Sequence, residues 1–119
     1  MFSELILDHF RHPRNAGELP GATAVVEVSN PVCGDVLQLA ARIENARLTE
    51  VRFLCRGCTA SIACGSLLTE KLAHHTLNQC RALTAEDLSE EFGLPAASEH
   101  AAQLAFDALQ ALLGKVVVS

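Results

Sequence analysis

Five cysteines are the residues of this 119-residue chain best able to do chemistry: Cys33, Cys55, Cys58, Cys64 and Cys80. Their number is odd, and the first residues lack the basic stretch and the unbroken apolar run of an export signal. Both observations argue against a framework of disulfides, which persists in oxidising compartments. The sequence therefore predicts free thiols or thiolate ligands for a metal.

The first candidate site is the segment Cys33-Gly34-Asp35, which follows Asn30-Pro31 and is expected to form a turn. Gly34 has no Cβ, so the backbone there can come close to a bound group. A thiolate prefers zinc, copper(I) or iron–sulfur clusters, whereas a carboxylate binds them less tenaciously. The alternative interpretation is an aspartate that caps its own turn beside an inert cysteine.

The second candidate is Cys58, which lies where an expected strand ends and an expected helix begins. Free amides and the helix dipole lower the pKa of a thiol at such a position, and Arg56 adds positive potential. We therefore expect Cys58 to be the most nucleophilic thiol. Cys55 and Cys64 fit an apolar core, and Cys80 is interpreted as structural because no companion motif surrounds it.

Among the five histidines, His100 is best placed for a site, because it begins the last expected helix just after a break at Leu94-Pro95. A neutral imidazole can bind a metal or carry a proton. An exposed or simply hydrogen-bonded histidine is the alternative. His74 and His75 lie at an expected helix end, where positive charge is favourable, and are interpreted as structural.

Two chemistries fit these residues. One is binding of a metal or cluster by Cys33, Asp35, Cys58 and His100. The other is dithiol–disulfide exchange by the Cys55-x-x-Cys58 pair at the junction of strand and helix. The surroundings disfavour the second, because such domains place a β-α-β unit upstream, whereas this chain places an expected antiparallel meander there.

The elements that must position these side chains follow from hydrophobic periodicity. Alternating apolar residues predict strands over residues 23–29, 36–44 and 48–55, and the short link between the last two suits a hairpin. Helical spacing predicts helices over residues 2–10, 60–74, 77–83 and 101–114, and a further helix after the capping box Thr84-Ala85-Glu86-Asp87. The fold class is α+β, a three-stranded antiparallel sheet with helices packed on one face, in a single domain over residues 1–119.

Composition excludes several classes of protein. Half of the residues are hydrophobic and 19% are charged, which excludes a disordered chain. A net charge of −5 and an aromatic content of 4% provide neither the basic patch nor the stacking platform that nucleic acid requires. No apolar run approaches the roughly 18 residues of a membrane span. We expect a cytoplasmic protein without a nucleic-acid or membrane partner.

Several spaced motifs, in one order along the chain, resemble the IscU/NifU-type iron–sulfur cluster assembly scaffold proteins. The resemblance begins at residues 6–15, ILDHFRHPRN, and continues through Cys33-Gly34-Asp35 and Gly57-Cys58 with the small-residue helix that follows. It then includes residues 66–70, SLLTE, and Leu94-Pro95 ahead of His100. The resemblance implies the α+β fold already expected and a scaffold rather than an enzyme.

Such scaffolds receive sulfur from a cysteine desulfurase, assemble a labile [2Fe–2S] cluster and pass it to recipient apoproteins. In the family, three cysteines, an aspartate and a histidine surround the cluster. The resemblance implies that Cys33, Asp35, Cys58 and His100 bind the iron or the cluster. The third cysteine should directly follow the histidine, and this chain has Ala101 there.

The departure at Ala101 puts sulfur acceptance in question more than metal binding. Four donors remain, and the same set suits tetrahedral Zn²⁺. Two alternatives therefore remain. One is an impaired paralogue of the scaffold, and the other is a zinc-binding sulfur-acceptor or interaction module that assembles no cluster. Cys55 or Cys64 could compensate in space, and a homodimer around a shared cluster could supply further thiols. The family's chaperone-recognition stretch, LPPVK, keeps only Leu94-Pro95, which predicts weak engagement of that chaperone.

Overall fold

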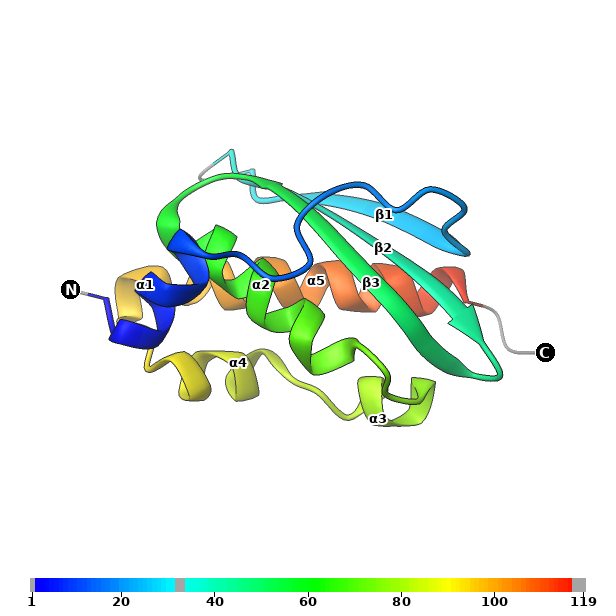
Figure 1. Cartoon of the computed structure of the whole chain (residues 1–119). Coiled ribbons are helices and arrows are strands. Elements are labelled where there is room, and N and C mark those ends of the chain that lie inside the picture. The colour runs from blue at the N-terminus through cyan, green and yellow to red at the C-terminus, as the bar shows by residue number, and fades with distance from the viewer. Residues whose placement is uncertain (1, 32–33, 117–119) are drawn as a thin grey trace.

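The computed structural model describes residues 2–31 and 34–116 of the chain. Its sheet has three antiparallel strands in the order β1-β2-β3, with β1 at Ala24–Ser29, β2 at Val36–Glu44 and β3 at Arg47–Arg56 (Figure 1). Asn45 and Ala46 join β2 to β3 with φ angles of 53° and 58°. Positive φ at both central residues is the geometry of a type I′ turn, which matches the twist of a hairpin. The predicted meander is confirmed.

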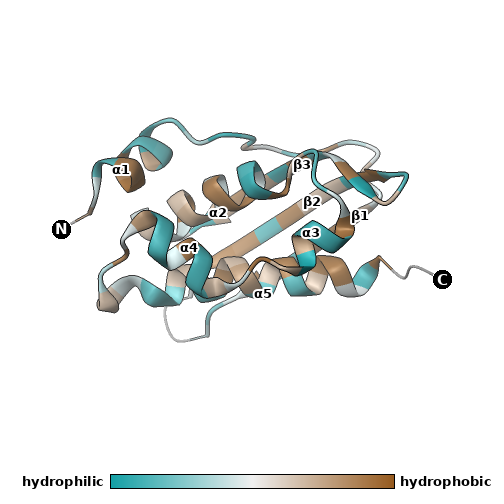
Figure 2. Ribbon diagram, turned by 90° about the horizontal axis from the view of Figure 1, so that it is seen from below, coloured by the Kyte–Doolittle hydropathy of each residue, from teal (hydrophilic) through white to brown (hydrophobic). Residues whose placement is uncertain are grey.

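The helices cover one face of this sheet. They are α1 at Glu4–Arg11, α2 at Thr59–Leu72, α3 at Leu77–Arg81, α4 at Ala85–Phe92 and α5 at Glu99–Lys115, with a 3₁₀ turn η1 at Ala96–Ser98. Helix α2 packs on β3, and α5 packs on β1, β2 and α2 (Figure 1). Apolar residues of the sheet lie between these two helices (Figure 2). The predicted α+β class is therefore confirmed.

The alternation of β2 explains which face is buried. Leu37, Leu39 and Ala41 are almost fully buried beneath the helices. On β3, Val51 and Phe53 are buried in the same way. Such alternation, with a period of two residues, places the apolar side chains of each strand on one side of the sheet.

Close packing of α2 on β3 depends on Gly65. A Cβ at this glycine would lie 2.7 Å from Cδ2 of Phe53, closer than two carbon atoms can approach. The small residue lets the helix backbone lie directly over the aromatic ring, which fixes the height of α2 above the sheet. This height in turn determines where the first turn of α2 stands.

Backbone segments from two loops cover the outer edge of β3. Phe53 exchanges two backbone hydrogen bonds with the segment at Asn15 and Gly17. Leu48 likewise donates to His75 O and accepts from His74 N. On the opposite edge, Lys115 Nζ donates to Val25 O of β1 at 2.8 Å. The sheet therefore presents few free backbone groups along β3.

Side-chain caps begin α1, α3 and α4. Ser3 caps α1 by accepting from Ile6 N, and the predicted capping box of Thr84 and Asp87 begins α4. A second capping box, between Thr76 and Gln79, begins α3. The expected helix over 60–74 was two residues too long, because His74 has a φ of 68° and bonds to β3 instead.

Among the residues that the structure describes, no helix is both long and apolar enough to cross a membrane.

Candidate metal centre

Three chain segments meet at one end of the sheet and bring together three of the four predicted ligands. Asp35 directly precedes β2, Cys58 precedes the first turn of α2, and His100 lies in the first turn of α5. One ligand atom from each of these residues lies within 4.8 Å of the other two. The fourth predicted ligand, Cys33, falls outside the described residues.

Cys58 stands at the N-cap of α2, with extended backbone angles of φ −75° and ψ 170°. Its side chain makes no capping hydrogen bond to the helix amides, and the residue is exposed. An N-terminal helix end carries free N–H groups and a partial positive charge, both of which favour a negatively charged ligand. The fold thus presents this sulfur to solvent at a helix end whose free N–H groups can receive a bound anion.

Asp35 is a buried carboxylate, only 6% exposed, beside the backbone of Gly57. Ser61 Oγ donates to Asp35 Oδ2 at 2.6 Å. A Cβ at Gly57 would lie 2.8 Å from Cγ and 3.0 Å from Oδ1 of Asp35, so a larger residue there would force the carboxylate to shift. The loop before Cys58 therefore makes room for the carboxylate, and the first turn of α2 holds it by a hydrogen bond.

His100 completes the group of donors. Its Nε2 lies 3.6 Å from Cys58 Sγ and 3.9 Å from Asp35 Oδ2. Two donors bound to one tetrahedral metal are separated by about 3.3–3.6 Å, from bond lengths of about 2.0–2.3 Å. The two observed separations fit one ion after small side-chain movements, and the set of one thiolate, one imidazole and one carboxylate is one that Zn²⁺ and iron accept.

The other described thiols lie in the core. Cys64 and Cys80 are buried, as the sequence predicted, and Cys55 is half-buried. Burial raises the pKa of Cys55 to about 11, that of Cys64 to about 12 and that of Cys80 to about 11. Because the thiolate is the attacking form, the raised pKa of Cys55 makes this residue unsuited to be the first thiol to attack a disulfide.

Ala101, where the resemblance expects a third cysteine, is 1% exposed and follows His100 in the first turn of α5. Its methyl group is part of the hydrophobic core, so this position contributes packing and offers no metal-binding atom. Of two residues that shape the site, Gly57 was noted from the sequence only as part of the motif Gly57-Cys58, and Ser61 was given no role. Ser61 follows Cys58 by three residues, a spacing that places two side chains on the same side of a helix, and this was the available signal.

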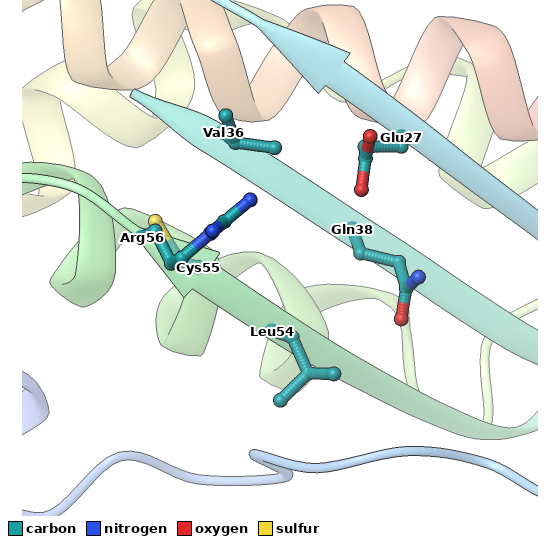
Figure 3. Close-up of a pocket in the computed structure, with 6 residues that line it drawn as sticks. All are labelled: Glu27, Val36, Gln38, Leu54, Cys55 and Arg56. Carbon is teal, nitrogen blue, oxygen red and sulfur yellow. The ribbon is translucent and has the colours of Figure 1, made fainter. Parts of the chain in front are cut away.

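A hollow lies on the face of the sheet that the helices leave uncovered, away from the donor group. It has a volume of about 300 Å³ and is lined by Glu27, Val36, Gln38, Leu54, Cys55 and Arg56 (Figure 3). Leu54 is 40% exposed there, and the Arg56 side chain extends from β3 toward β2 (Figure 3). Asp35, Cys58 and His100 do not line this hollow, so it is separate from the donor group.

The motif at residues 6–15 serves to fasten α1 to α2. His9 is 2% exposed, with Nδ1 2.7 Å from Ser66 Oγ and Nε2 3.2 Å from Glu70 Oε1. The backbone N–H of Arg14 donates to the same serine hydroxyl at 2.8 Å. Burial lowers the pKa of His9, which favours the neutral ring in this position. The motif therefore has a structural part in positioning α2, whose N-cap residue is Cys58.

Comparison with known proteins identifies the family. The family described as NifU-like N terminal domain matches residues 1–116 of the chain. The chain belongs to this family. The resemblance found in the sequence is thereby confirmed.

Two named relatives align with more than nine tenths of this chain. The chain is 36% identical over 111 residues to the iron–sulfur cluster assembly scaffold protein IscU 1 of Archaeoglobus fulgidus, covering 92% of this chain and 72% of the relative. It is 34% identical over 116 residues to the IscU scaffold protein of Haemophilus influenzae, covering 94% and 92% of the two chains. A crystal structure of a nitrogen-fixing NifU-like protein (N-terminal) from Brucella abortus has the same fold, with a TM-score of 0.79, 15% identity, and coverage of 96% and 92%.

Proposed function

We propose that this chain is an iron–sulfur cluster assembly scaffold. In this proposal the [2Fe–2S] cluster and its iron are cargo, held by Cys33, Asp35, Cys58 and His100. A cysteine desulfurase supplies sulfur, and recipient apoproteins accept the finished cluster. The observation that carries the proposal is the convergence of Asp35, Cys58 and His100 within 4.8 Å, in a chain of the NifU-like family.

Sulfur acceptance is assigned to Cys58, the exposed thiol at the N-terminus of α2. Its thiolate attacks the outer sulfur of the desulfurase persulfide, forms a new S–S bond and releases the desulfurase cysteine as a thiolate. Cys58 then carries the persulfide, and atoms and charge balance. Conversion of that sulfur to sulfide needs two electrons, which an external reductant must supply.

The mixed donor set explains how a scaffold releases its cargo. Thiolates hold iron–sulfur clusters firmly, whereas a carboxylate is a harder ligand and binds such soft centres less tenaciously. Asp35 therefore supplies the exchangeable position. Ala101 removes one thiolate from each chain, and a homodimer around a shared cluster would restore the number of sulfur ligands.

Anaerobic reconstitution with iron, cysteine, a desulfurase and an external reductant tests the proposal, with the persulfide measured before the reductant is added. We expect cluster absorbance and a persulfide on Cys58 by mass spectrometry, with both lost in Cys58→Ser. Cys80→Ala is the matched control, because Cys80 is buried in α3 and lies outside the donor group. Absence of cluster absorbance together with absence of a persulfide on any thiol would reject the scaffold.

A zinc-binding sulfur-acceptor or interaction module is the second candidate. The specific observation in its favour is Ala101, which leaves two cysteines, one carboxylate and one histidine, a set that suits tetrahedral zinc. Elemental analysis of protein purified without added metal separates the two candidates. One zinc per chain that iron does not displace would favour the module over the scaffold.

A further inference from the structure

Ser61 lies at the third position of α2 and contacts two of the three clustered donors. Its Oγ is 2.6 Å from Asp35 Oδ2 and 3.3 Å from Cys58 Sγ. The residue itself is 1% exposed. No other side chain in the described part of the molecule is hydrogen-bonded to both of these residues.

A serine at this position is not explained by packing alone. The neighbouring α2 residues Ala60, Ala63 and Cys64 are small and fully buried. A hydroxyl in such surroundings must be hydrogen-bonded, since a buried polar group without a partner is costly. Serine also has no helix-forming advantage over alanine. The hydroxyl is therefore present for the contacts that it makes with the donors.

The direction of these hydrogen bonds follows from the groups involved. A carboxylate only accepts, so the single Ser61 proton points to Asp35 Oδ2, and the oxygen lone pairs remain for a Cys58 S–H. That same Oδ2 is the oxygen 3.9 Å from His100 Nε2. Ser61 thus fixes the carboxylate oxygen that faces the other donors. Among the described residues it makes the only hydrogen bond to the Asp35 side chain.

We propose that Ser61 is a positioning residue of the metal site, which holds Asp35 Oδ2 in the direction of Cys58 and His100. This inference rests on the proposed function and deepens it, because it names the residue that orients the exchangeable ligand. Partners that orient metal ligands in this way are worth about 10–100-fold in metal affinity. Loss of the hydroxyl removes the side-chain hydrogen bond that holds Asp35 Oδ2 in this direction.

Co²⁺ alone is the probe, measured by competition with a chelating dye and by its thiolate-to-metal absorption. We expect Ser61→Ala to weaken Co²⁺ binding about 10–100-fold. Thiolate-to-cobalt absorption should remain at saturation, because Cys58 still binds. Thr59→Ala, which removes a hydroxyl from the same helical turn, is the matched control and should bind like the unaltered chain. Thermal unfolding of each variant checks that the fold is retained.

A double-mutant cycle with Asp35→Ala decides whether Ser61 acts through the carboxylate. In the Asp35→Ala background, Ser61→Ala should change Co²⁺ affinity by less than about 3-fold, because the oriented group is already absent. An equal loss in both backgrounds, or unchanged affinity in Ser61→Ala alone, would overturn the inference. If the unaltered chain binds no Co²⁺, the proposed metal site itself fails. If Asp35→Ala binds as tightly as the unaltered chain, Asp35 is no ligand and the inference falls with it.

Discussion

Gly57→Ala tests the space that the chain reserves for the Asp35 carboxylate. The added Cβ would lie 2.8 Å from Asp35 Cγ, 3.0 Å from Oδ1 and 3.1 Å from Cβ. Carbon atoms in van der Waals contact stand about 3.5–4.0 Å apart, so the carboxylate must retreat by roughly 0.7 Å or more. Binding sites tolerate displacements of only about 0.5 Å before their geometry fails.

The expected result is a large loss of metal affinity with a small loss of stability. The carboxylate either leaves the Ser61 hydroxyl or moves away from His100, and we expect Co²⁺ affinity to fall about 10-fold or more. Overpacking costs about 1–3 kcal/mol in a core. Because Gly57 is exposed and its neighbour is a side chain, the free energy of unfolding should fall by an amount near the lower end of that range.

Co²⁺ competition and urea unfolding measure the two effects separately. Gly114→Ala is the matched control, because a Cβ there meets no atom within 4 Å. Combining Gly57→Ala with Asp35→Ala removes the group with which the new methyl collides, so the double variant should bind Co²⁺ like Asp35→Ala alone. The reasoning is refuted if Gly57→Ala binds Co²⁺ as tightly as the unaltered chain.

Three further predictions concern the missing thiol, the buried histidine and the order of thiol reactivity. Ala101→Cys should raise cluster yield in reconstitution, since it adds a thiolate beside the site, and an unchanged yield would show that this position does not face the cargo. Burial lowers the pKa of His9 from 6.5, so the unfolded chain takes up its proton first. The free energy of unfolding, from urea titrations, should thus be highest above about pH 6.5 and should fall as the pH drops through the pKa of the unfolded chain. His9→Gln should make that fall smaller. In timed alkylation at pH 8 followed by mass spectrometry, Cys58 should react before Cys55 and Cys64, whose pKa values of about 11 and 12 keep them protonated; earlier labelling of either would contradict this order.

Local patterns were sufficient to predict most of the fold. The alternation in residues 36–44 and 48–55 predicts strands because a half-buried sheet needs apolar residues at every second position. The Thr84 capping box also predicts its helix from four adjacent residues. The helix end at Leu72 was missed because its cause is not local. His74 and His75 leave the helix to bond with Leu48, a residue in another element.

The sequence was sufficient to name three side chains that converge, but not the residues that support them. Asp35, Cys58 and His100 have side chains whose chemistry marks them in the sequence, and the structure brings them together. The contacts of Gly57 and Ser61 with Asp35 join residues that lie more than twenty positions apart in the chain. Spacing within the sequence does not reveal such contacts, because they depend on how β2 and α2 meet at the end of the sheet.

The covered edge of β3 limits how two copies of this chain could join. The backbone groups of Phe53 and Leu48 already bond to loop segments. On the other edge of the sheet, the Lys115 ammonium group donates to the backbone carbonyl of Val25 in β1. Charged or covered margins discourage the growth of one sheet into another. If two copies share a cluster, growth of one sheet into the other is thus disfavoured, and we expect them to meet at the end of the sheet where Asp35, Cys58 and His100 lie.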